Sequence, residues 1–224
     1  KGYVVHLSCE AALKEAMAAK AKGIDLSIES VIPHFIMDKT YAERPNHEGA
    51  KFVMSPPLRD KSNKKDLWDD LAKGFIDTVG TDHCPFDVEQ KAMGKGDFTK
   101  IPNGMPAIED RVNLLYTYGV SRGNLDIHRF VNAASTRVAK LFGLESKGDI
   151  AVGKDADLVI YDPNHKSTIS AKTQLMNNDY NPCEGMEIDG KPSVVTVRGK
   201  VAVKDGKFVG EVGRGKLLKR QAMK

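Results

Sequence analysis

The chain has 224 residues, of which 41% are hydrophobic and 29% charged, and its formal net charge is +4 at pH 7. This length suits one large domain or two small ones, and the small, evenly spread charge does not favour a nucleic-acid-binding protein. Basic residues gather only in residues 214–224, which we interpret as a solvated tail. No apolar run approaches membrane-spanning length, and we expect neither a membrane segment nor a signal peptide.

The cysteines give no sign of a disulfide framework. Their number is odd, they lie far apart in the sequence, and none belongs to a C-x-x-C pair: Cys9, Cys84 and Cys183. We therefore expect a reducing compartment, the cytoplasm.

Predicted strands and helices alternate through the first 79 residues. The predicted strands are residues 3–6, 26–31, 51–54 and 75–79, and the predicted helices are residues 9–22 and 63–73, the second capped by Ser62. Such alternation is typical of a parallel sheet with crossover helices, either a barrel or a doubly wound sheet. The strands are too few to close an eight-stranded barrel. Because the chain begins directly on a core strand without a methionine, we expect the second half of a barrel, cut from a larger protein.

In the remaining sequence, predicted helices are followed by predicted β-strands. Residues 87–105 are polar and are predicted to form a loop, and helices are predicted at 107–118, 126–134 and 135–142, the last two capped by Asp126 and Ser135. From Gly148 onward, turn residues separate short predicted strands at 158–162, 194–198, 201–203 and 207–209. Asp205-Gly206 is a typical hairpin turn, so this part is expected to be antiparallel.

The stretch around Asp82 is the strongest candidate for chemistry. The predicted strand 75–79 delivers Asp82 and His83 to a loop bounded by Gly80 and Pro85. In barrels of alternating strands and helices, catalytic groups lie at the carboxyl ends of strands. A carboxylate there binds a metal, acts as a general base, or does both. The alternative is that Asp82 only caps a loop, and that His83 either orients a neighbour by hydrogen bonding or simply packs.

Three further residues lie at predicted strand ends or in loops. His6 ends the first strand and would face the same barrel mouth as Asp82, as a shared metal site requires, although a lone histidine there is more often structural. Ser55, in a Ser-Pro-Pro break, would present a hydroxyl at that mouth, or belongs to a simple turn. Asn103 would present amide and main-chain groups to a substrate, or again only forms a turn. No P-loop, G-x-G-x-x-G or zinc-ribbon spacing is present in the sequence.

Five stretches carry a resemblance to a known family. They are residues 3–8 (YVVHLS), 54–59 (MSPPLR), 80–86 (GTDHCPF), 103–111 (NGMPAIEDR) and 178–185 (NDYNPCEG). In this order they resemble the dihydropyrimidinase and D-hydantoinase family of the amidohydrolase superfamily, and the likeness runs through essentially the whole chain. Residues 153–159 (GKDADLV) are similar to many amidohydrolases and discriminate less.

The resemblance implies a hydrolase that opens cyclic amides, either dihydropyrimidines such as dihydrouracil, as in pyrimidine catabolism, or 5-substituted hydantoins. It implies two divalent metal ions, usually zinc, which activate a hydroxide. On that pattern His6 matches a metal-ligating histidine, and Asp82 matches the aspartate that binds the other metal and serves as general base. Ser55 and Asn103 match residues that contact the cyclic imide through main-chain groups. Family members are usually homotetramers.

The implied fold class is α/β, the C-terminal part of a metal-dependent amidohydrolase TIM barrel with a segment of a small β-sandwich domain. We divide the chain into residues 1–147, the second half of the catalytic barrel; 148–210, the β-sandwich segment and connecting loop; and 211–224, the tail. The family's His-x-His pair, its carboxylated lysine, another histidine ligand and a tyrosine all belong upstream of this chain. We therefore expect a fragment that is inactive alone and that aggregates or associates with its missing half.

Two other interpretations remain open. Allantoinases and dihydroorotases also use a strand end similar to residues 55–59, although residues 82–86 and 179–182 favour the hydantoinase side. Non-catalytic, dihydropyrimidinase-like assembly proteins share the fold but have an incomplete metal site. The presence of both His6 and Asp82 argues against that class.

Overall fold

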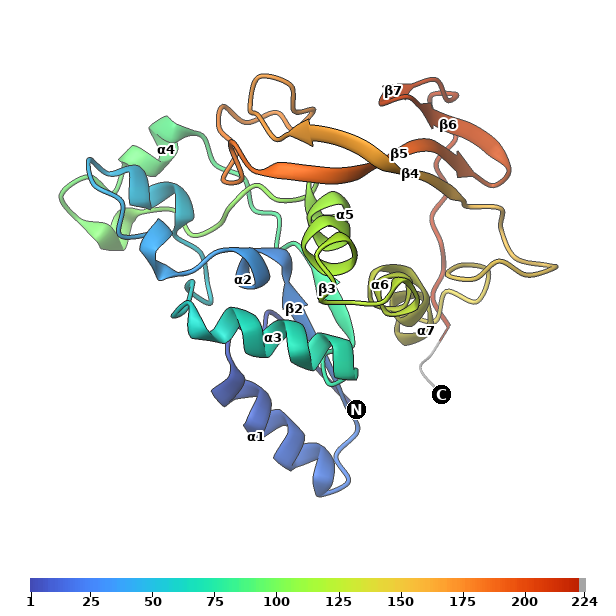
Figure 1. The fold of residues 1–224 in the computed structure, drawn as a ribbon, viewed down its shortest axis with the longest axis horizontal. Helices are drawn as coiled ribbons and strands as arrows, with labels where there is room; N and C mark the ends of the chain where they lie inside the picture. The colour runs from blue at the N-terminus through green and yellow to red at the C-terminus, as the bar shows by residue number, and fades with distance from the viewer. Residues whose placement is uncertain (222–224) are drawn as a thin grey trace.

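In the computed structural model, which describes residues 1–221, a parallel sheet forms the centre of the N-terminal part (Figure 1). Its strands are β1 (Gly2–Val4), β2 (Leu26–Val31) and β3 (Thr78–Gly80), in the order β1-β2-β3. Tyr3 pairs with Ser27, and Ser30 pairs with Val79. The carboxyl ends of all three strands therefore lie at one edge of the sheet, as the alternating pattern predicts.

Helices connect these strands and cover the sheet. The connections include α1 (Glu10–Ala21), α2 (Ile32–Ile36) and α3 (Ser62–Lys73). α3 lies between α1 and α2 (Figure 1), and its Trp68 indole donates a hydrogen bond of 3.1 Å to the carbonyl of Phe35. Ser62 is the first residue of α3 and makes no capping hydrogen bond, so the predicted cap at Ser62 is wrong by one position.

The predicted strand at residues 51–54 is wrong. Residues Glu48–Phe52 instead form a 3-10 helix, followed by irregular chain. Phe52 and Met54 are buried, as in a strand, because their side chains join the core. A run of apolar residues indicates that a segment is buried, but it does not indicate whether the backbone pairs with a neighbouring strand. The apolar pattern therefore predicted a strand where none forms.

The polar segment 87–105, predicted as a loop, contains a short helix. α4 (Val88–Ala92) begins with a capping box in which Asp87 and Gln90 bond each other's main-chain N–H groups. A further turn of 3-10 helix follows at Phe98–Lys100. The Asp and Gln spacing at the N-terminus was the available signal for this helix.

Two longer helices follow. The first is α5 (Arg111–Leu114), continued by the π-helical turns of η4 (Leu115–Ser121). The second runs without a break through α6 (Ile127–Val131), η5 (Asn132–Thr136) and α7 (Arg137–Leu141). Asp126 caps it by accepting a 2.8 Å hydrogen bond from the N–H of Arg129. Ser135 lies inside this helix, so the predicted second start there is wrong.

The C-terminal part is an antiparallel sheet of β4 (Val159–Thr168), β5 (Glu187–Val197), β6 (Lys200–Lys204) and β7 (Lys207–Phe208). Asp205 and Gly206 both have positive φ, 50° and 75°, and form the predicted tight hairpin between β6 and β7. β4 continues past Asp162, where the predicted strand ended, because an irregularity between Asp162 and Lys166 accommodates Pro163.

The antiparallel sheet packs on the helix formed by α5 and η4 (Figure 1). Thr117 of that helix exchanges hydrogen bonds with the main chain of Asp189, at 3.1 and 3.0 Å. The rings of Tyr116 and Tyr161 lie 4.5 Å apart between centroids. Ile188 of β5 joins the same hydrophobic core as the parallel sheet, so the two sheets share one buried interior.

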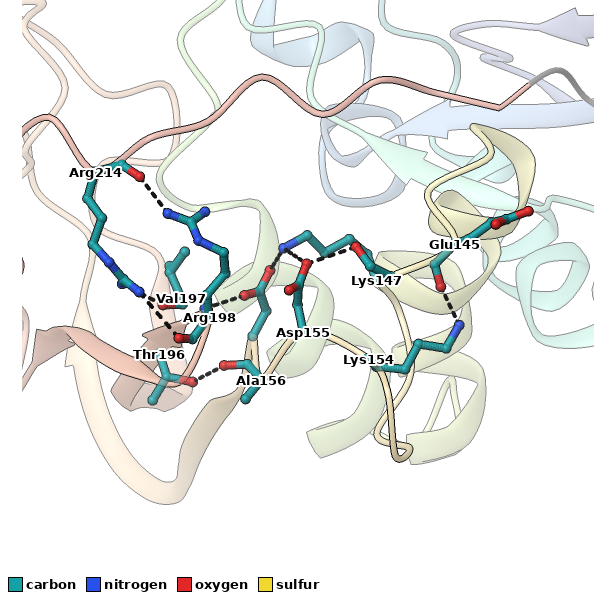
Figure 2. Close-up of polar contacts among 11 residues, drawn as sticks. Glu145, Lys147, Lys154, Asp155, Ala156, Thr196, Val197, Arg198 and Arg214 are labelled. Carbon is teal, nitrogen blue, oxygen red and sulfur yellow. Dashed lines mark hydrogen bonds and ion pairs between the residues drawn. The ribbon is translucent and has the colours of Figure 1, made fainter.

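A polar network, which we call the linker clasp, ties the linker between α7 and β4 to the sheet. Figure 2 shows Lys147, Asp155, Arg198 and Arg214, and Asp157 completes the network. Lys147 pairs with both aspartates, at 2.8 Å to Asp155. Asp157 accepts a 2.7 Å hydrogen bond from the N–H of Arg198, and Arg214 donates one of 2.6 Å to the Val197 carbonyl. The boundary placed at residues 147 and 148 falls in this linker and stays a prediction.

Within residues 1–221, no helix combines the length and apolar character needed to cross a bilayer.

Candidate functional site

His6 and Asp82 meet where β1 and β3 end. The His6 Nε2 and an Asp82 carboxylate oxygen lie 3.5 Å apart, although the residues are far apart in the sequence. Both have positive φ, 55° for His6 and 47° for Asp82. Side chains other than glycine rarely adopt this conformation, and when they do they are often at functional sites. The parallel sheet thus brings together the two residues that the sequence singled out as metal ligands.

Glu29 of β2, which the sequence analysis did not single out, orients His6. Its carboxylate lies 3.0 Å from the His6 Nδ1, which leaves Nε2 facing Asp82. The other Glu29 oxygen accepts a 3.0 Å hydrogen bond from the Tyr3 hydroxyl, which also lies 2.7 Å from Thr78 Oγ1. Burial raises the pKa of Tyr3 to about 12, so its hydroxyl stays protonated. The sequence feature that could have identified Glu29 is its position near the carboxyl end of β2, the strand next to β1.

The arrangement of His6 suits a metal ligand. A metal-ligating histidine characteristically binds a carboxylate through its second ring nitrogen, which fixes its tautomer and orientation. Glu29 supplies that carboxylate, and Asp82 adds an oxygen donor beside the free Nε2. Among residues 1–221, no cluster of three or more His, Cys, Asp or Glu side chains is arranged to hold a metal ion. These residues therefore fit part of a metal site, with two donors and their supporting carboxylate.

His83, whose role the sequence left open, orients a neighbouring segment. Its Nδ1 accepts hydrogen bonds from the main-chain N–H groups of Ala107, at 3.1 Å, and Ile108, at 3.3 Å. Burial lowers the pKa of His83, which favours the neutral ring that can accept them. His83 therefore fixes the chain after Asn103, and its Nδ1 is not available to a metal.

The loops that carry Asp82, Ser55 and Asn103 lie side by side. The Gly104 N–H donates 3.0 Å to the Val53 carbonyl, and the Cys84 N–H donates 3.2 Å to the Met105 carbonyl. Gly104 has a φ of 142°, and a Cβ there would lie 2.6 Å from the Cys84 Cβ. Only glycine allows the loops to approach this closely. Ser55 and Asn103 themselves are exposed.

The segment 178–185 supports these loops from outside. Asp179 accepts a 2.9 Å hydrogen bond from Val88, and its own N–H donates 3.3 Å to Asp87, at the start of α4. Asn181 donates 2.8 Å to the buried Asp110 carboxylate. The stretch that contributes to the family resemblance thus fixes the positions of the site loops.

His34 of α2 is a buried histidine beside this region. Its side chain is almost fully enclosed, and neither ring nitrogen has a hydrogen-bond partner within residues 1–221. Burial, with the positive charge of Arg59 and the proximity of His6, lowers the pKa of His34 to about 4. The ring is therefore neutral at neutral pH.

Comparisons with known proteins agree on one family. The model of the amidohydrolase family matches residues 4–202. A D-hydantoinase of Geobacillus stearothermophilus is 50% identical over 220 residues, covering 97% of this chain and 47% of that protein. A dihydropyrimidinase of Rattus norvegicus is 43% identical over 222 residues, covering 98% of this chain and 43% of that protein.

Solved structures give the same result. A D-hydantoinase (dihydropyrimidinase) from Thermus sp. superimposes with a TM-score of 0.97 at 74% identity, covering 100% of this chain and 49% of that chain. The chain spans about half the length of the curated relatives it matches. The resemblance and the α/β fold class predicted from the sequence are both confirmed.

Proposed function

Because this chain belongs to the amidohydrolase family, we propose that the protein carrying it hydrolyses the amide bond of cyclic amides, either dihydropyrimidines or 5-substituted hydantoins. The observation that carries the proposal is the pair of His6 and Asp82, 3.5 Å apart at the ends of two parallel strands, with Glu29 behind His6. The relatives named D-hydantoinase and dihydropyrimidinase support this substrate class.

Amidohydrolases generally depend on a metal, and we propose two divalent ions, zinc, for this protein. His6 would hold one through Nε2, and Asp82 would hold the other through its carboxylate. Catalytic zinc sites take three protein ligands each as a rule, so further ligands would come from outside the described residues. When bound, such ions polarise an amide carbonyl and lower the pKa of water.

Asp82 is the proposed proton carrier. It accepts a proton from the water that attacks the carbonyl carbon, and it returns a proton to the ring nitrogen as the C–N bond breaks. The ring opens to a carboxylic acid and a neutral N–H group, Asp82 regains its ionised form, and the acid releases its remaining proton to solvent as it becomes a carboxylate. Ser55 and Asn103, two exposed residues beside the Asp82 loop, hold the ring through main-chain groups.

We also propose a cytoplasmic homotetramer for the complete protein. The cysteines of the described chain are unpaired, which supports a reducing compartment. Large apolar side chains are exposed on the antiparallel sheet, among them Val159, Ile160 and Phe208. Exposed apolar surface of this kind favours association with further protein.

Elemental analysis of metal per chain, with intact mass measured on the same sample, tests the proposal. We expect about two zinc ions per complete chain and essentially none on residues 1–224 alone, which are expected to be inactive. Rates on dihydrouracil, hydantoin, allantoin and dihydroorotate then identify the substrate class, with the first two expected to be fastest. A complete protein that forms a tetramer but holds no metal would instead indicate a non-catalytic assembly protein.

A further inference from the structure

Lys91 of α4 is a buried lysine whose charge is enclosed by main-chain oxygens. Its side chain is 1% exposed. The ammonium donates hydrogen bonds to the carbonyls of Val53 at 3.1 Å, Pro102 at 2.6 Å and Gly104 at 2.7 Å. A protonated lysine has three N–H donors, so each donor has its own acceptor. Burial lowers the pKa of Lys91 to about 8, and the carbonyls favour the protonated form, so it is charged at neutral pH.

The acceptors belong to the two segments that present the proposed substrate contacts. Val53 lies two residues before Ser55, and Pro102 and Gly104 flank Asn103 on either side. The Gly104 N–H also donates to the Val53 carbonyl, at 3.0 Å. Lys91 thus joins, through one ammonium group, two loops that are far apart in the sequence and adjacent in the site.

This arrangement fixes the direction of the peptide groups around Asn103. In a planar trans peptide the C=O and N–H point in opposite directions. Because the Pro102 carbonyl points at Lys91, the Asn103 N–H points away from Lys91. Because the Gly104 N–H points at Val53, the Asn103 C=O points away from Val53. Within residues 1–221, neither main-chain group of Asn103 has a hydrogen-bond partner, so one donor and one acceptor are available to a ligand.

We propose that Lys91 is a positioning residue that sets the orientation of the Asn103 main chain toward the substrate ring and holds the segment before Ser55 in place beside it. The inference rests on the proposed function, because a cyclic amide presents adjacent C=O and N–H groups that match such a donor and acceptor. Loss of the ammonium would leave buried carbonyls without a donor, and the two loops would relax. His6 and Asp82 follow other strands, so metal binding should not change.

Two variants of the complete, metal-loaded protein test this. Lys91→Met removes the charge and the donors at similar length, and Lys91→Gln keeps a shorter amide donor. The matched control is Lys95→Met, an exposed lysine shortly after the same helix. We expect Lys91→Met to raise KM for the cyclic amide roughly tenfold or more, with kcat changed much less and metal content unchanged. Lys91→Gln should give a smaller rise, and Lys95→Met should match the wild type.

Hydrogen exchange in peptides spanning residues 53–55 and 102–105 supplies a readout independent of catalysis. Exchange should accelerate in Lys91→Met and not in Lys95→Met. An unchanged KM in folded Lys91 variants, or failure of both variants to fold, would overturn the positioning role and assign Lys91 to stability. If the wild type hydrolyses no cyclic amide, the proposed function fails, and the exchange rates alone decide whether Lys91 orders these loops.

Discussion

The candidate site formed by His6, Glu29, Asp82 and Lys91, which we call the strand-end site, and the linker clasp both contain charged side chains, but the roles of these side chains differ. At the site, Glu29 and Lys91 are largely enclosed, and each holds other polar groups in fixed positions. In the linker clasp, the Asp155 and Asp157 side chains are 28% and 33% exposed, and Lys147 pairs with both. If one aspartate is lost, Lys147 keeps its ion pair with the other aspartate and gains contact with water. The His6 and Asp82 side chains are 28% and 30% exposed, much like these aspartates, so the difference lies in the number of alternative partners rather than in burial. Single substitutions should therefore be severe at the site and mild in the clasp.

The largest effect is expected at Asp82. Asp82→Asn removes the proton acceptor and a metal ligand while keeping the size of the side chain, so hydrolysis of cyclic amides should fall by roughly 1,000-fold or more. The thermal midpoint should change little, because Asp82 is only half-buried. The control is Asp25→Asn, an exposed carboxylate in the turn before β2. Activity in Asp82→Asn close to that of the control would contradict its assignment as general base.

His34 should make the protein less stable in acid. The unfolded chain binds a proton at about pH 6.5 and the folded chain only near pH 4, so lowering the pH between these values favours unfolding. The free energy of unfolding should fall by on the order of 3 kcal/mol across this range, and His34→Phe should remove that share of the pH dependence. Urea unfolding at pH 7 and pH 4.5 measures it.

The matched control for this measurement is His128→Phe, at an exposed position. It should retain the pH dependence of the wild type. A His34→Phe protein with the same pH dependence as the wild type would show that the pKa of His34 does not differ between the folded and the unfolded chain.

Glu29→Gln should weaken metal binding without destroying the site. The amide keeps a hydrogen bond to His6 Nδ1 but no longer supplies a negative charge behind the ligand, so metal affinity should fall by about 10- to 100-fold. Competition with a chelator measures it in the complete protein. Glu15→Gln, on the exposed face of α1, is the comparison that should not change. Equal affinities in both variants would remove Glu29 from the site.

The smallest effect is expected in the linker clasp. Lys147→Met should lower the thermal midpoint by no more than about 2 °C, because its two aspartate partners are partly exposed, are screened by salt and keep other hydrogen bonds, from Ser146 and the Arg198 N–H. Asp157→Asn should behave alike, since Lys147 retains Asp155. Differential scanning calorimetry at low and high salt distinguishes this from a buried network. A large decrease in the thermal midpoint that does not depend on salt would show that the linker clasp, like the strand-end site, is sensitive to single substitutions.

The sequence predicted the functional residues at strand ends better than it predicted the side chains that hold those residues and the neighbouring loops in position. The parallel sheet, the meeting of His6 with Asp82 and the Asp205-Gly206 hairpin follow from local patterns of period and turn chemistry. Glu29 and Lys91 were not singled out, because their roles depend on distant partners. The partners of the Glu29 side chain lie at least 23 residues away in the sequence, and those of the Lys91 side chain lie at least 11 residues away. A single glutamate or lysine carries no local sign of such a contact.

The wrong assignments have the same physical origin. Residues 51–54 read as a strand because Phe52 and Met54 are buried, yet tertiary packing holds them without a neighbouring strand. Ser135 read as a helix start because serine favours caps, yet the continuous helix from α6 to α7 overrides that preference. Contacts between residues far apart in the sequence determine the structure of both segments, and a local sequence pattern does not reveal such contacts.

The two hydrogen bonds that join Asp179 to Asp87 and Val88 have a consequence for protein engineering. They join the start of α4, and with it Lys91, to a segment that lies between β4 and β5 of the antiparallel sheet. A chimaera that exchanges residues 148–210 with those of a relative would therefore also replace the outer support of the substrate loops. Recombination between relatives should preserve activity best when residues 87–110 and 178–185 are inherited from the same parent.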